Sequence, residues 1–179
     1  MIDDKYLTWF NEEFGYVDGL TWCSATSPHD VLAAYGVAAA EAEPATLALL
    51  PELRLLVGRL GKGTLVIQPN GCPTNDVLRP LAQYGPCLSV HWSDTTPPGI
   101  TYVTGEKPAI FFDPFDWEFI PEPDIESVNK WISATPAGHD TWKDDWARAA
   151  LITAESLFGE KVDEKWVRAS HTGVPQNAS

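Results

Sequence analysis

Four side chains of the sequence have the chemistry of a metal or acid–base site: His91, Asp94, Asp113 and Asp116. An imidazole with two or three carboxylates suits a divalent cation, and the same groups can transfer protons. His91 and Asp113 lie at the ends of two runs of strand-forming residues, so they meet if both ends reach one edge of a sheet. The sequence contains neither H-x-x-x-H nor H-E-x-x-H, and Asp94 lies in SDTTPPG, which is typical of a turn. This set therefore stays an alternative: an enzyme, or a small-ligand or metal-binding domain, with its site at this end of the sheet.

The segment 109–124, AIFFDPFDWEFIPEPD, combines aromatic rings with five acids, three prolines and no basic residue. A proline-stiffened segment loses less entropy when a partner orders it. Rings set among carboxylates suit a basic, partly apolar surface. We predict that a partner-binding surface is formed by Asp113, Phe115, Asp116, Trp117, Glu118, Glu122 and Asp124. The competing interpretation is structural, with Phe115 and Trp117 folded over the core and the acids solvating them.

Two further motifs have simpler structural explanations. GRLGKGT resembles a phosphate-binding loop, but Gly63 follows Lys62 where that motif needs Ser or Thr, and the flanking residues predict a hairpin. Ser24, Ser27, His29 and Asp30 include the residue types of a hydrolase triad within a few positions. Because triad members come from distant segments, we interpret Ser27 and Asp30 as the cap and first-turn acid of a helix.

The three cysteines, Cys23, Cys72 and Cys87, are widely spaced and form no C-x-x-C pair. This pattern predicts a reduced cytosolic protein without a disulfide framework or a zinc site. Cys23 and Cys87 fall inside predicted strands, where a buried and inert thiol is the usual outcome. Cys72 falls in a loop and is expected to be the more exposed thiol.

The formal charge of −13, from 25 acids and 12 bases, predicts repulsion from phosphate backbones and anionic lipid. We therefore expect no direct nucleic-acid binding and no membrane binding. The first residues, MIDDKYLTWF, lack the basic and apolar regions of a signal peptide, and no apolar run reaches membrane-spanning length. These features predict a cytoplasmic protein.

Strand-forming runs follow one another with short turns, while helical patterns gather towards the two ends of the chain. This order predicts a single α+β domain over 1–179. We expect an antiparallel sheet of about five strands in a meander, with helices from both chain ends packed on one face. Residues 37–51 are interpreted as a loop or weak helix and 170–179 as a frayed tail. The predicted helices cover 3–14, 27–36, 74–85, 124–133, 140–159 and 163–170; the predicted strands lie in 20–27, 52–71, 86–92, 99–103 and 107–112.

Four stretches occur in an order that resembles a family of uncharacterised proteins common in actinomycete bacteria. The stretches are GLTWCSATSPHDVLAAYG, GTLVIQPNG, SVHWSDTTPPGITYVTGEKPAIFFDP and RAALITAESLFGEKVDEKWV. They span most of the chain and consist of packing and turn residues. The resemblance implies the fold and a single domain, and it carries over no catalytic residue.

The leading interpretation is a small acidic cytosolic protein that acts by protein–protein interaction. Its charge suits an immunity-type or inhibitor-type partner of a basic toxin or nuclease. An acidic mimic of nucleic acid is a further alternative that shares the charge argument. The sequence leans away from an enzyme and predicts no cofactor, and it leaves the oligomeric state open.

Overall fold

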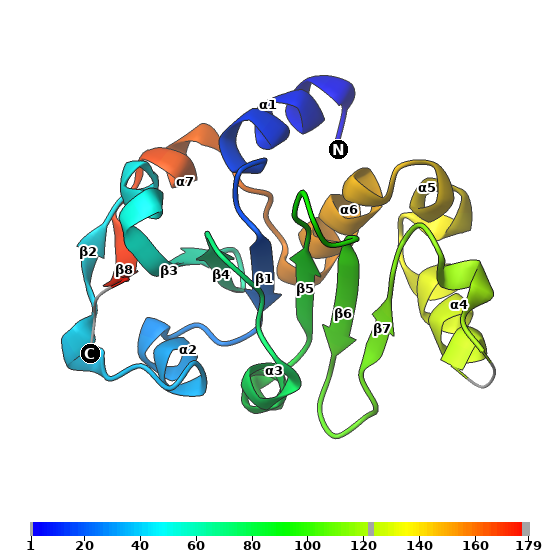
Figure 1. Ribbon diagram of the computed structural model, residues 1–179, viewed down its shortest axis with the longest axis horizontal. Helices are drawn as coiled ribbons and strands as arrows, with labels where there is room; N and C mark the ends of the chain where they lie inside the picture. Colours follow the sequence, from blue (N-terminus) through cyan, green and yellow to red (C-terminus); the bar gives the residue numbers. More distant parts are fainter. Residues whose placement is uncertain (1, 122–123, 177–179) are drawn as a thin grey trace.

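The computed structural model describes residues 2–121 and 124–176 and shows an α+β fold built on an antiparallel sheet (Figure 1). Within these residues the sheet has eight strands in the order β2-β8-β3-β4-β1-β5-β6-β7, so the prediction of about five strands was wrong. A meander exists only in part, because β1 lies between β4 and β5, and β8 lies between β2 and β3. The strands are β1 (Gly19–Cys23), β2 (Glu43–Ala45), β3 (Leu53–Leu60), β4 (Gly63–Gln68), β5 (Cys87–His91), β6 (Gly99–Val103), β7 (Ile110–Phe112) and β8 (His171–Pro175).

Two of these strands fall where the sequence predicts none. β2 lies in the segment interpreted as a loop, and β8 lies in the segment interpreted as a frayed tail. β8 reads HTGVP, and its Gly and Pro disfavour an isolated strand. It forms because β3 supplies a partner edge, with Leu55 opposite Val174 and Val57 opposite Thr172. Residues 177–179 of the predicted tail lie outside the described part of the chain.

Most helices cover one face of the sheet. These are α1 (Asp4–Phe14), α4 (Asp124–Ala134), α5 (Gly138–Asp144), α6 (Trp146–Phe158) and α7 (Glu164–Arg168). Alternation along the strands sends every second side chain to this face, where it enters the larger core cluster. The cluster joins strand residues such as Leu20, Trp22, Leu65, Ile67, Leu88 and Val90 to helix residues such as Phe10, Phe14, Ile132, Trp142 and Phe158.

The helices from the two chain ends pack on one face as predicted, but two short helices nearer the middle of the chain cover part of the opposite face. α2 (Pro28–Ala34) and α3 (Asn75–Leu81) contribute to a second core cluster. Its members include Cys23, Val31, Leu32, Val57, Val66, Leu78, Leu81, Cys87 and Val103. These helices leave the far edge of this face open, where Phe111 of β7 is exposed. The remaining short 3-10 helices are Ala39–Glu41, Leu47–Glu52, Ala82–Tyr84 and Trp117–Phe119.

The long helix predicted over 140–159 is interrupted at Asp145. Its backbone leaves the helical region, with φ −152° and ψ 77°, and separates α5 from α6. The Asp145 carboxylate accepts hydrogen bonds from the Arg148 amide and from the Arg148 guanidinium, each at 3.0 Å. Asp145 is therefore the N-cap of α6 and not a residue of its first turn. Within the described ranges, no helix is long and apolar enough to cross a membrane.

Candidate functional site

The acidic aromatic segment lies at one end of the sheet. β7 is the last strand in the order, and α4 lies next to it (Figure 1). Phe111, Phe115 and Phe119 are 59%, 69% and 81% exposed. These rings are three of the six exposed large hydrophobic side chains in the described part of the protein. Phe111 and Phe119 also line one groove, whereas Phe115 packs against Trp146.

Two other rings of the same segment anchor it to the core. Trp117 is 2% exposed, and its ring centroid lies 5.7 Å from Phe112 and 5.0 Å from His139. Between the anchors, the Asp113 carboxylate accepts a hydrogen bond from the Phe115 amide at 2.8 Å. This turn directs the Phe115 ring away from the core, where its edge meets Trp146 at 6.5 Å between centroids.

The structure separates the seven residues predicted to form the surface. Trp117 lies in the core, so its placement on the surface was wrong; the ring fills the space beneath the segment. Phe115, Asp116, Glu118 and Asp124 are exposed and Asp113 is partly exposed, while Glu122 lies outside the described residues. The predicted partner-binding surface did not include Phe111 and Phe119, which are exposed. The sequence signal for Phe111 was the pair Phe111–Phe112, since neighbours in a strand face opposite sides. We call Phe111, Phe115, Phe119, Asp113, Asp116 and Glu118 the aromatic edge.

A groove of about 660 Å³ runs between β7 and the start of α4, and it includes part of the aromatic edge. Its lining combines Phe111 and Phe119 with the carboxylates of Asp113, Asp116 and Asp124. Glu118, which lies outside the groove lining, pairs with Lys143 at 3.1 Å, but both side chains are exposed and the pair adds little stability. Within the described residues, no Lys or Arg side chain pairs with Asp116 or Asp124. The groove thus offers apolar area and negative charge together.

The alternative set of His91, Asp94, Asp113 and Asp116 is not assembled as a metal site. In residues 2–121 and 124–176, no three His, Cys, Asp or Glu side chains gather as a metal ion would require. Asp94 lies in an exposed turn, whereas His91 is half-buried and stacks on Phe111 with 6.5 Å between centroids. Burial lowers the pKa of His91, and the Asp113 carboxylate opposes that shift. His91 and Asp113 therefore interact, but they form only a pair of side chains.

The other motifs behave as structural elements. Lys62 lies in the hairpin that joins β3 to β4, as the sequence predicts. Ser27 stands at the N-cap position of α2, although its side chain makes no capping hydrogen bond. His29 is exposed and lies 3.8 Å from Asp30. Cys72 is exposed, in agreement with the prediction.

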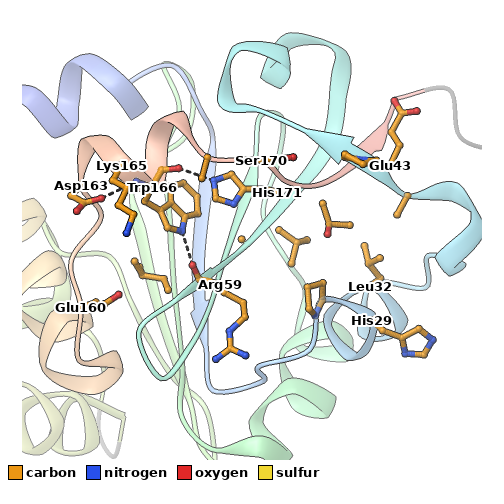
Figure 2. A pocket seen from close by; sticks show the side chains of 18 of the residues that line it. His29, Leu32, Glu43, Arg59, Glu160, Asp163, Lys165, Trp166, Ser170 and His171 are labelled. Carbon is orange, nitrogen blue, oxygen red and sulfur yellow. Dashed lines mark hydrogen bonds between the residues drawn. The ribbon is translucent and has the colours of Figure 1, made fainter.

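A second cleft, of about 1080 Å³, lies beside the end of β3 and was missed by sequence reasoning (Figure 2). β8 pairs with β3 only as far as Val57, and the Trp166 indole then donates a hydrogen bond to the Arg59 carbonyl at 2.7 Å. The His171 ring packs against Trp166 at a tilt of 31°, with 4.1 Å between centroids, and its Nε2 donates to the Trp166 carbonyl at 2.8 Å. These contacts fix a rigid aromatic wall. Because the sequence did not predict β8, it did not predict this cleft either.

The charged side chains of this cleft differ in whether they already form hydrogen bonds or ion pairs within the protein. The Asp163 carboxylate accepts from the Trp166 amide at 2.8 Å, and the Glu160 carboxylate accepts from the Gly61 amide at 3.1 Å. The side chains of Arg59 and Lys165 form no ion pair or hydrogen bond within the described part of the chain. Burial lowers the pKa of His171, and its hydrogen bond to the Trp166 carbonyl acts in the opposite direction.

The chain matches no family model, no curated protein and no solved structure. The resemblance to the actinomycete family therefore stays a prediction. Any function rests on the site geometry alone.

Proposed function

We propose that this protein acts by binding another protein through the aromatic edge. The observation that carries the proposal is the exposure of Phe111, Phe115 and Phe119 among carboxylates on one short segment. Covering an exposed phenylalanine ring contributes about 1.5–3 kcal/mol of transfer free energy. The three rings supply affinity, and the anchors Phe112 and Trp117 keep the segment ordered before binding. Such preorganisation lowers the entropy lost on association.

The partner that this surface suits has a basic and partly apolar face. The net charge of −13 attracts a basic protein over a long range, and the groove carboxylates pair with its Lys or Arg side chains. An immunity-type or inhibitor-type role against a basic toxin or nuclease fits these properties. A pure mimic of nucleic acid needs charge without rings, so the exposed phenylalanines favour the first role over the second.

The double variant Phe115→Ser/Phe119→Ser should lose a partner that the wild-type protein captures from lysate of its native host. Removing two exposed anchor rings should weaken binding by about 100-fold, and the wild-type complex should dissociate as salt is raised. Immobilised proteins and mass spectrometry of the retained material measure both effects.

The matched control is Tyr16→Ser/Tyr84→Ser, which removes two rings that are 56% and 54% exposed outside the aromatic edge. This control should retain the same partner as the wild-type protein. Equal retention by all three proteins would contradict the proposal, because it would show that the captured protein does not use the aromatic edge.

The second cleft supports a second candidate function, the binding of a small anionic molecule. A volume of about 1080 Å³ is large enough for a small ligand, and the Trp166–His171 wall is fixed in place. The cations Arg59 and Lys165 have no partner in the described chain, while Asp163 and Glu160 are held by backbone amides. Figure 2 shows Glu43 and His29 on the far side of the cleft from Trp166. Arg59 and Lys165 are the cations through which the cleft would hold an anion, whereas the carboxylates of Glu43, Glu155, Glu160 and Asp163 also line the cleft and oppose its binding.

Citrate and inorganic phosphate at millimolar concentration should raise the melting temperature of the wild-type protein, since a ligand that binds the native state stabilises it. Arg59→Ala/Lys165→Ala should abolish this increase. Arg54→Ala changes an exposed cation on the same strand that does not line the cleft, and it should leave the increase intact. An equal increase in the double variant would exclude the cleft as the anion site.

A further inference from the structure

Two buried thiols face each other at the centre of the sheet. Cys23 is the last residue of β1 and Cys87 is the first residue of β5, and the two are directly opposite in the antiparallel register. Both are 0% exposed and belong to the same core cluster, so their side chains point to the same face. The sequence interpretation treated each thiol separately and gave no sign that the two are neighbours.

The hydrogen-bond phase of β1 and β5 determines how close the two cysteines lie. The Trp92 amide donates to the Asp18 carbonyl at 2.9 Å, and continuing the register past Gly19 and His91 makes these residues opposite each other. Asp18 and Trp92 thus form a hydrogen-bonded pair, and such pairs alternate with non-hydrogen-bonded pairs. Counting along the register makes Cys23 and Cys87 a non-hydrogen-bonded pair. Cα atoms of such a pair lie about 4.5 Å apart, within the range that a disulfide spans.

A neighbouring pair shows that side chains on this face do touch across the two strands. Thr21 and Ser89 are opposite each other two residues before the cysteines, and their hydroxyl oxygens lie 3.0 Å apart. The pKa of Cys87 is raised mainly by two effects, of which the hydrogen bond between the two thiols is the larger and burial the smaller. The pair therefore rests as a dithiol in reducing conditions at neutral pH.

We propose that Cys23 and Cys87 are a redox couple that a low-molecular-weight disulfide such as oxidised glutathione converts into a cross-strand disulfide. The thiolate of one cysteine attacks the glutathione disulfide, which forms a mixed disulfide and releases one glutathione. The second cysteine attacks the mixed disulfide, forms the Cys23–Cys87 bond and releases the other glutathione. The protein loses two electrons and two protons, and both leaving groups end as glutathione thiols.

The location of the pair provides a route for the reagent. Both cysteines stand at strand ends, and just beyond them the Ser24 hydroxyl donates to the Pro86 carbonyl at 3.0 Å and the Thr64 hydroxyl donates to the Ala25 carbonyl at 2.6 Å. Opening at this end must also displace the residues of α2 and α3 that share the second core cluster with the thiols, and it leaves the rest of β1 paired with β5. The disulfide then closes a long loop in the centre of the sheet, which restricts the unfolded chain and stabilises the native state.

The test uses the Cys72→Ser variant, in which the exposed thiol cannot interfere. The variant is equilibrated with mixtures of reduced and oxidised glutathione, once in buffer and once in urea above its unfolding midpoint. Mass spectrometry after acid quenching measures the fraction that has lost about 2 Da through disulfide formation. Since the native register holds the thiols together, the equilibrium constant for the disulfide should be at least about tenfold larger in the folded protein.

Two results would overturn the proposal. One is a folded-state equilibrium constant equal to or below the unfolded-state value, which would show that the native geometry rejects the bond. The other is a folded protein that accumulates a glutathione adduct instead of the internal disulfide. The control is Cys23→Ala/Cys72→Ser, whose single thiol should form only the glutathione adduct in urea.

Discussion

Phe112→Ala should lower the free energy of unfolding by about 3–5 kcal/mol, because it removes a large ring from a well-packed core. Phe112 is 1% exposed, and its ring centroid lies 5.5–5.8 Å from those of Trp117, Trp131 and Trp142. These three rings come from different elements, so none of them can move to fill the space without leaving its other contacts. Equilibrium urea denaturation followed by tryptophan fluorescence measures the change.

The adjacent residue provides a matched control for this prediction. Phe111→Ala removes the same side chain from the same strand, but Phe111 is 59% exposed and lies on the other face. Its effect on the free energy of unfolding should stay within about 0.5 kcal/mol, as for other surface substitutions. Similar losses of stability for both variants would show that the Phe111 ring is not free at the surface. The aromatic edge would then lose one of its three exposed rings.

Gly58→Ala should lower the free energy of unfolding by about 2–3 kcal/mol through overpacking. A Cβ atom at Gly58 would lie 2.5 Å from Nδ1 of His171 and 2.5 Å from a ring carbon of Trp166. Neither ring can shift freely, because the Trp166 indole is bonded to the Arg59 carbonyl and His171 is bonded to the Trp166 carbonyl. Urea denaturation at equilibrium measures the loss.

Arg59→Ala is the control for the Gly58 variant. The side chain of Arg59 is exposed and lines the same cleft, while its backbone carbonyl remains available to Trp166. This control should leave the free energy of unfolding within about 0.5 kcal/mol of the wild-type value. A Gly58→Ala variant as stable as the wild type would mean that the aromatic wall moves easily, and the second cleft would then lack the fixed shape that a ligand site requires.

The sequence by itself determined the elements whose signals are local. The hairpin of β3 and β4 follows from two apolar runs around a glycine turn, and α1 follows from the spacing of Tyr6, Phe10 and Phe14. Gly159 ends α6 with φ 82°, which its missing Cβ allows. The sequence also indicated the acidic aromatic segment as a surface, because its charges and prolines exclude it from a sheet interior.

Only the tertiary structure decided which members of that segment are exposed. Alternation predicts that Phe111 and Phe112 face opposite sides, but the side that is buried depends on where α4 and α5 pack. The same packing buries Trp117 and leaves Phe119 exposed. Likewise, β8 is a strand because it pairs with the edge of β3, and the second cleft lies beside this pairing. Cys23 and Cys87 became neighbours through the register of β1 against β5. Each of these outcomes depends on contacts between residues far apart in the chain, and no local pattern encodes such contacts.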